Sequence, residues 1–160
     1  MRGSEPNASI YYLARLLSVG EITSVCRRIL VCACEDVGLA YPQIFSYVKS
    51  LTDIAMQVGM PEARIPLSDA VLLIALSPKS NSAYKAVNQA MNDIKNGMVC
   101  PIPEHLCNHS SNYKYPFDYL NNWVSQQYLP NDIKNKKYYH PQNNKNESIF
   151  ANYWNQIAKK

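Results

Sequence analysis

The stretch SPKSNSAY, residues 77–84, connects two strongly helical segments and contains no glycine. Pro78 ends the apolar run before it, because proline has no backbone N–H with which to continue a helix. The polar residues at 80–82 can each accept a hydrogen bond from the free N–H groups that open the next helix. This stretch therefore predicts a helix end followed directly by a capped helix start. Alternatively, Lys79 and the exposed N–H groups of that helix start could hold an anion such as a phosphate.

Apolar residues at three- and four-residue spacing predict five helices on either side of this stretch. A glycine ends four of them, Gly20, Gly38, Gly59 and Gly97, and Ser4 is the expected cap of the first. The fourth helix is apolar nearly all round and should be central. The expected helices cover 4–18, 22–37, 42–58, 67–76 and the segment from the 77–84 joint to Gly97.

The composition changes after Gly97, where prolines stand among aromatic and asparagine residues. Residues 98–141 contain too many aromatic rings for a disordered tail, so an ordered, irregular arm with a short helix near 117–128 is expected to wrap the helical core. A polar linker at 142–146 then leads to a last amphipathic helix. The fold prediction is an all-α helical bundle with an extended irregular aromatic arm.

The charge and the apolar runs limit the class of protein. A formal net charge of +4 permits contact with nucleic acid but falls short of a dense basic stripe. No run reaches the roughly 18 apolar residues that span a bilayer, and the N-terminus lacks the apolar core of a signal peptide. We therefore expect a cytoplasmic protein without membrane contact.

Five cysteines, an odd number, are expected to be free thiols. Cys32 and Cys34 are two residues apart on a predicted helix, so they point in different directions and are expected to pack as small apolar residues. A cluster at Cys100, His105, Cys107 and His109 could suggest zinc. Its spacing does not match paired zinc hooks, however, and no metal site is predicted.

Glu35 and Asp36 end the second predicted helix, where the helix dipole disfavours acidic groups. A structural ion pair with Arg15 or Arg64 is the favoured explanation. A catalytic carboxylate pair is the alternative, but no histidine or nucleophile lies nearby in the sequence.

Lysines lie beside aromatic residues in two basic-aromatic stretches, 113–115 and 134–139. Such stretches can stack on bases and neutralise phosphates, as in single-strand binders. They are equally compatible with rings that pack inward while the lysines remain in water. The candidate nucleic-acid contacts are Lys114, Lys134, Lys136 and Lys137.

A phosphate-binding loop of the form G-x-x-x-x-G-K-[ST] does not occur, nor does an Asp/Glu pair follow an apolar strand to hold magnesium. The chain is therefore not expected to be an enzyme by itself.

Six motifs occur together in order: RGSEPN with YYLAR near the start, EDVGLA at 35–40, GMPEARIP at 59–66, SPKSNSAY at 77–84, YKYP at 113–116 and WVSQQYLP at 123–130. Together they closely resemble the C-terminal region of the replication-associated recombination protein A family, also called MgsA. These proteins are AAA+ ATPases with a eukaryotic relative in the Werner-helicase-interacting protein. The resemblance covers most of residues 2–141. Relatives usually carry a longer insertion rich in lysine and glycine between Leu106 and Tyr113, whereas only residues 107–112 remain here. Any DNA contact that this insertion makes in relatives is therefore expected to be reduced in this chain.

The resemblance implies a helical domain similar to clamp-loader collar domains, which assembles the ATPase, typically as a homotetramer. The whole enzyme would be DNA-dependent, act at stalled or damaged forks and contact single-strand binding protein. Its ATP and Mg²⁺ would be held by an N-terminal AAA+ core absent here, so the chain is expected to be part of a longer protein.

The expected organisation is a helical oligomerisation core at 1–97, an arm at 98–141 that packs on it, and a linker with a terminal helix at 142–160. Because the family specifies the whole 77–84 turn, we expect it to fix the angle between two helices, with Asn81 and Ser82 bonding backbone across the joint and Tyr84 packing beneath. The motif positions expected to matter for assembly are Tyr12, Arg15, Glu35, Asp36, Lys79, Asn81, Tyr84, Tyr115, Trp123 and Tyr128.

Overall fold

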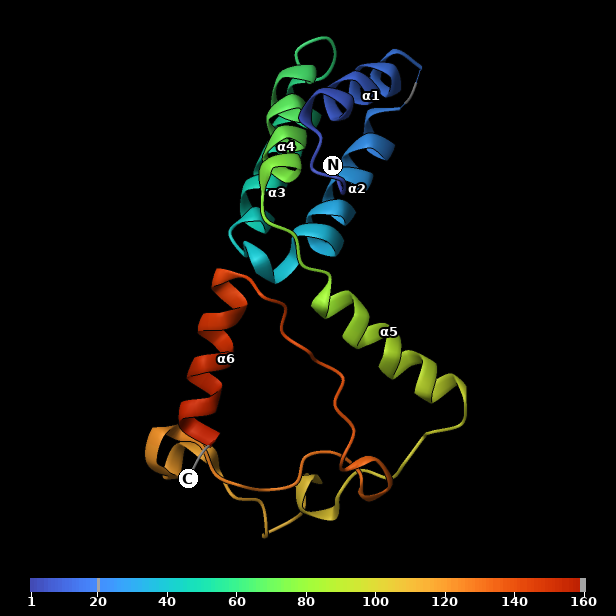
Figure 1. Ribbon diagram of the computed structural model, residues 1–160. Coiled ribbons are helices and arrows are strands. Elements are labelled where there is room, and N and C mark those ends of the chain that lie inside the picture. The colour runs from blue at the N-terminus through green and yellow to red at the C-terminus, as the bar shows by residue number, and fades with distance from the viewer. Residues whose placement is uncertain (20, 159–160) are drawn as a thin grey trace.

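The computed structural model describes residues 1–19 and 21–158, and this part of the chain contains helices, turns and irregular segments but no strand. The all-α prediction is confirmed. Four helices form a bundle and two more extend from one of its ends (Figure 1). The six helices are α1 (Pro6–Val19), α2 (Ile22–Cys32), α3 (Ile44–Val58), α4 (Arg64–Leu76), α5 (Ser82–Lys95) and α6 (Lys145–Ala158).

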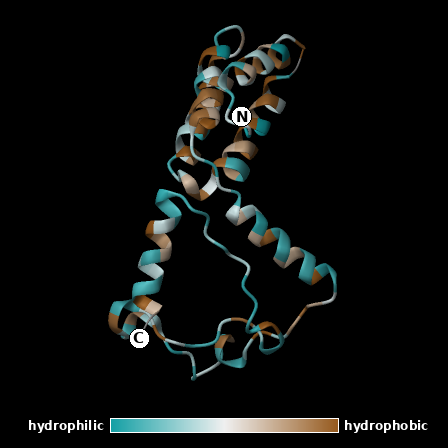
Figure 2. Ribbon diagram, in the orientation of Figure 1, coloured by the Kyte–Doolittle hydropathy of each residue, from teal (hydrophilic) through white to brown (hydrophobic). Residues whose placement is uncertain are grey.

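Helix α4 is the centre of the bundle, as its nearly uniform apolar surface predicts. Its buried positions Leu67, Ala70, Val71, Ile74 and Ala75 follow a three- and four-residue spacing. Helix α4 packs against α3 and α1, and α2 packs against α3. The apolar colouring of Figure 2 is accordingly concentrated in the bundle.

The first two helices differ from the prediction at their ends. Helix α1 begins at Pro6, and its cap is Glu5 rather than Ser4, since the Glu5 carboxylate accepts the N–H groups of Ala8 and Asn7 at 2.5 and 3.1 Å. These hydrogen bonds lower the pKa of Glu5. Helix α2 continues to Val37 only as a π-helical turn, Ala33–Val37. The predicted stop at Gly20 falls outside the described residues.

The arm at 98–141 contains only four single 3₁₀ turns, Glu104–Leu106, Pro116–Asp118, Leu120–Asn122 and Asn131–Ile133. The predicted helix near 117–128 is wrong, because Asn121 and Asn122 have positive φ angles of 60° and 53°. The arm does not wrap the four-helix bundle, although it was expected to wrap the helical core. None of its side chains is buried, and Figure 1 shows the arm running from the end of α5 around to the start of α6, away from the bundle.

The five cysteines are free thiols, with Cys26 buried, Cys32 half-buried and Cys34 exposed. The packed position predicted for Cys34 is therefore wrong. Burial raises the pKa of Cys26 and Cys32. None of the helices described is long and apolar enough to cross a membrane.

Candidate functional site

The 77–84 stretch meets the turn that follows α2, and the two backbones are in direct contact. The N–H of Ser80 donates to the carbonyl of Asp36 at 2.8 Å. Gly38 has a φ of 50°, and a Cβ placed there would lie 2.6 Å from the Ser80 carbonyl oxygen. Only glycine therefore permits this approach, which sets where α5 leaves the bundle.

Lys79 closes the end of α4 instead of facing the start of α5. Its ammonium donates to the carbonyls of Ala75 and Ser77 at 3.0 and 2.5 Å, and burial lowers its pKa. The Lys79 ammonium, which the alternative anion site requires, is thus bound to carbonyls of the chain itself. It satisfies carbonyls that the helix itself leaves unpaired.

The cap of α5 agrees with the prediction at Ser80 and differs from it at Asn81 and Tyr84. The Ser80 hydroxyl oxygen accepts the N–H of Ser82 at 3.3 Å. The side chain of Asn81 does not bond backbone across the joint, since its oxygen accepts the side-chain amide of Gln142 at 2.7 Å. Tyr84 is exposed and does not pack beneath the turn.

Glu35 and Asp36 are paired with Arg2, and the prediction of Arg15 or Arg64 is wrong. The Arg2 guanidinium lies 2.5 Å from Asp36 Oδ1 and 2.6 Å from Glu35 Oε1, and the two carboxylates raise the pKa of Arg2. Asp36 is buried, and its Oδ2 has no hydrogen-bond partner in the described part of the chain.

The two arginines expected there are engaged elsewhere. Arg15 lies over the ring of Tyr11, 5.9 Å from its centroid, and Arg64 donates to the carbonyl of Pro61 at 2.6 Å. Both contacts lie within the bundle helices and their connections.

A fully buried carboxylate, Glu147, ties α6 to the same joint. Its oxygens accept the Tyr139 hydroxyl at 3.0 Å and the Asn144 side-chain amide at 2.5 Å. Burial alone would raise the pKa of Glu147, but hydrogen bonds from Ser80, Ser82, Asn144 and Tyr139 together lower it. Burial and the same carboxylate raise the pKa of Tyr139 to about 12.

Sequence reasoning missed this group, although a signal was present. Asn144 accepts the N–H of Glu147 at 3.0 Å, which is the N-cap and third-residue spacing of a capping box. Directly before Glu147, Asn146 donates to the Ala40 carbonyl at 2.7 Å. The start of α6 is therefore bound both to the α5 cap and to the turn after α2.

Beside these contacts lies a surface pocket of about 370 Å³ between the bundle, the start of α5 and the linker that precedes α6. Five of the predicted motif residues line it, Glu35, Asp36, Lys79, Asn81 and Tyr84, together with Arg2, Ser80 and Gln142. The joint brings these motif positions together because it fixes the direction of α5.

The other predicted motif residues lie elsewhere. Tyr12 lines a separate, mostly apolar hollow of about 260 Å³ between α1, α2 and α4. Arg15 is on α1. Tyr115 and Tyr128 are exposed in the arm, where Trp123 is half-buried.

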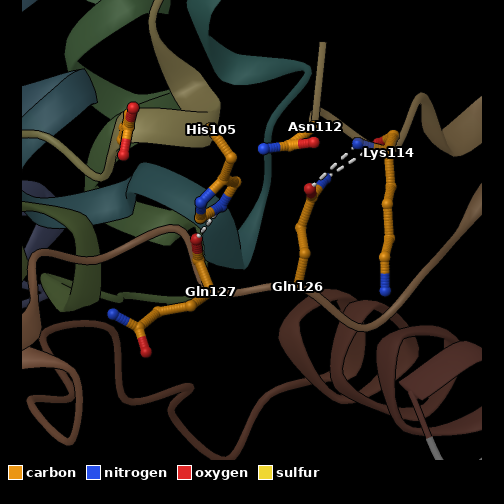
Figure 3. A pocket seen from close by; sticks show the side chains of 6 residues that line it. His105, Asn112, Lys114, Gln126 and Gln127 are labelled. Atoms are coloured by element: carbon orange, nitrogen blue, oxygen red, sulfur yellow. Dashed lines mark hydrogen bonds between the residues drawn. The ribbon is translucent and has the colours of Figure 1, made fainter. Parts of the chain in front are cut away.

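The arm has a polar pocket of about 380 Å³ (Figure 3), held together by side chains bonding backbone. The side-chain amide of Gln126 accepts the N–H of Lys114 at 3.3 Å and donates to its carbonyl at 2.9 Å. His105 Nε2 lies 2.8 Å from the Gln127 carbonyl. In the described residues no three His, Cys, Asp or Glu side chains converge as a metal site, and the cluster around Cys100 and His105 is no exception.

One of the four candidate nucleic-acid lysines has a partner within the chain. Lys136 donates to Asp93 on α5 at 2.9 Å, and the Tyr138 hydroxyl donates to the same oxygen at 2.9 Å. The hydrogen bond with Asp93 raises the pKa of Lys136, while the pKa of Asp93 falls. This cluster ties the arm to α5, whereas Lys114, Lys134 and Lys137 are exposed.

Known proteins are similar in sequence to this chain over nearly its whole length. A family model for the MgsA AAA+ ATPase C terminal matches residues 3–158. The chain is 45% identical over 171 residues to Replication-associated recombination protein A of Bacillus subtilis, covering 100% of this chain and 41% of that protein. It is 33% identical to the Haemophilus influenzae protein of the same name, covering 89% and 35%.

A eukaryotic relative, ATPase WRNIP1 of Dictyostelium discoideum, is 30% identical over 87% of this chain and 17% of its own length. The chain thus spans less than half the length of these relatives. The resemblance drawn from the six motifs is confirmed. The chain belongs to the MgsA AAA+ ATPase C-terminal family, whose members include replication-associated recombination proteins.

Proposed function

We propose that this chain is the oligomerisation domain of a DNA-dependent AAA+ ATPase that acts in replication, recombination and repair at stalled forks. The family assignment and the names of its relatives support the context. ATP and Mg²⁺ would be held by an AAA+ core outside this chain, in a protein of the cytoplasm. Single-strand binding protein is a further expected partner of the whole enzyme.

The observation that carries the assembly role is the apolar surface left open outside the bundle. On α5 the side chains of Val87, Met91 and Ile94 are 53%, 63% and 57% exposed, although they share one helix face. Burying such surface stabilises an assembly by about 25 cal/mol for each Å² of apolar area removed from water. Copies that bury it against one another would hold their ATPase cores close enough for an arginine of one subunit to complete the nucleotide site of the next, most simply in a homotetramer.

Light scattering of the purified chain at micromolar concentration tests this proposal. We expect a mass of several times 18.2 kDa, and about four times for a tetramer. A single species of 18.2 kDa at all concentrations up to 100 µM would count against the assembly role.

A second candidate is a nucleic-acid-binding module in the arm. Tyr113, Tyr115 and Phe117 are exposed around Lys114, with the rings of Tyr115 and Phe117 5.3 Å apart. Exposed rings beside a lysine can stack on bases while the ammonium contacts a phosphate.

A fluorescence titration with labelled single-stranded and forked DNA separates the two candidates. Binding through the arm must weaken steeply between 50 and 200 mM salt and fall in a Lys114→Ala, Tyr115→Ala double variant. Lys49→Ala, which removes a lysine paired with Asp53 on α3, is the matched control. The absence of binding at low salt would remove this candidate.

A further inference from the structure

Helix α5 carries an apolar stripe that nothing in the described chain covers. Tyr84, Val87, Met91 and Ile94 follow one another at spacings of three, four and three residues, the repeat with which helices pair along a seam. They are 46–63% exposed, and Ser82 is the buried residue of this helix. The amphipathic pattern of α5 is therefore that of a packed helix, while its surroundings are those of an isolated one.

Helix α6 has the same property. Phe150, Tyr153 and Trp154 lie on one face at helical spacing and are 46–60% exposed, and the buried residue of α6 is Glu147 at its start. Exposing three aromatic side chains to water on one helix face is unfavourable. Large exposed apolar patches of this kind mark interaction sites.

The two stripes do not cover each other within one chain. Glu147 and the Ser80 and Ser82 hydroxyls hold the starts of both helices at the joint, and Figure 1 shows the helices diverging from there, while the arm runs from the far end of α5 back to the start of α6. The joint thus holds the two stripes apart.

We infer that α5 of one copy packs along α6 of a second copy, and α5 of the second along α6 of the first. The inference rests on the proposed assembly role and names its surface. Such an exchange is a two-fold symmetric contact, because the pairing of α5 from one copy with α6 from the other occurs twice. It covers both stripes with a single partner.

The area supports a second copy as the occupant. An aromatic side chain presents about 150–250 Å² and an aliphatic one somewhat less, so each stripe offers roughly 350 Å² at the observed exposures. Four stripes, two from each copy, would bury roughly 1,400 Å², which falls in the range of about 1,200–2,000 Å² for a stable protein interface. One stripe alone would not reach it.

The charge on the two helices also favours a protein surface over a phosphate backbone. The stripes themselves carry no charged residue, and the positions that flank the α5 stripe, Ala83, Asn88 and Ala90, are small or neutral, except for Lys95 in the last turn. Small neutral flanks allow two helices to approach without like-charge repulsion.

Glutamates placed in the stripes test the surface. Met91→Glu on α5 and Tyr153→Glu on α6 should each raise the dissociation constant of the assembly by about a hundredfold or more, because each buries an unpaired charge at the contact. Phe117→Glu, in the arm and 68% exposed, is the matched control and should leave assembly unchanged. Circular dichroism should show unchanged helix content, since all three residues are exposed.

Cross-linking tests the exchange itself, in a background with the exposed Cys34 and Cys107 replaced by serine. A mixture of one protein carrying Met91→Cys with another carrying Tyr153→Cys, treated with a short thiol cross-linker, should give a product of two chains at least tenfold above either protein alone. Efficient linking of Met91→Cys protein to itself would overturn the exchange in favour of α5 pairing with α5.

The failures are distinguishable. An assembled wild type whose mass resists both glutamates overturns this surface and leaves the assembly role standing. A wild type that is monomeric at every concentration overturns both.

Discussion

The joint between the bundle and α5 depends on the absence of a side chain at residue 38, and Gly38→Ala should damage it more than any other glycine substitution described here. Gly38 has φ 50° and ψ −133°, a backbone conformation that side chains disfavour by about 1–3 kcal/mol. The added methyl would lie 2.6 Å from the Ser80 carbonyl oxygen, so the two backbones must separate. Separation weakens the Ser80 to Asp36 hydrogen bond, which contributes about 0.5–1.5 kcal/mol.

Together these terms predict a loss of about 3 kcal/mol in the free energy of unfolding. For a domain of this size that corresponds to a midpoint temperature lower by roughly 6–12 °C. Urea and thermal denaturation at one fixed protein concentration measure it, followed by circular dichroism at 222 nm.

Gly97→Ala is the matched control. Gly97 also has a positive φ, of 90°, but nothing lies within 4 Å of the Cβ position. Gly97→Ala should therefore lower the free energy of unfolding by only about 1 kcal/mol, the cost of placing a side chain at a positive φ. Equal losses for the two variants would show that the contact with Ser80 does not constrain the joint.

Four further predictions concern the charges around the joint and the arm. Glu147→Ala should destabilise the chain by about 2–4 kcal/mol, because it leaves buried donors unpaired. Because the pKa of Glu147 is lowered in the folded state, the carboxylate contributes fully to the free energy of unfolding above its ordinary pKa of 4.5, and this contribution is lost as the pH falls through the folded pKa. Glu147→Gln should therefore flatten the acid side of a stability profile measured from pH 7 to 3. Arg2→Met leaves the buried carboxylate of Asp36 without its donor and should lower the midpoint temperature of unfolding. A midpoint temperature equal to that of the wild type would contradict the pairing. Asp93→Asn should release Lys136 and so speed tryptic cleavage after that residue, whereas unchanged cleavage would mean that other contacts hold the arm on α5.

The bundle could be predicted because its signals are local. Apolar spacing and the glycine stops locate the helices, and the uniform apolar surface of α4 identifies it as central. The motif positions that line the joint pocket were likewise marked in the sequence, although their meeting there depends on the turn at Gly38.

The rest depends on contacts between distant residues. The pairing of Arg2 with Asp36 spans 34 positions, and the contact between Asn146 and Ala40 spans 106. Helical periodicity gives no information on which arginine crosses such a distance.

The arm was predicted to pack on the core because many aromatic rings usually indicate burial within the same chain. In this structure the rings of Tyr115 and Phe117 stay exposed, as do those of α6. A sequence shows that a surface is apolar without showing which chain covers it.

The assembly role is tested most directly by sedimentation velocity of the wild-type chain over a dilution series from 100 to 1 µM. We predict an assembled species whose mass is a multiple of 18.2 kDa and which dissociates on dilution. Met91→Glu should abolish this species, and Phe117→Glu should leave it intact. A single species of 18.2 kDa at every concentration would contradict the assembly role.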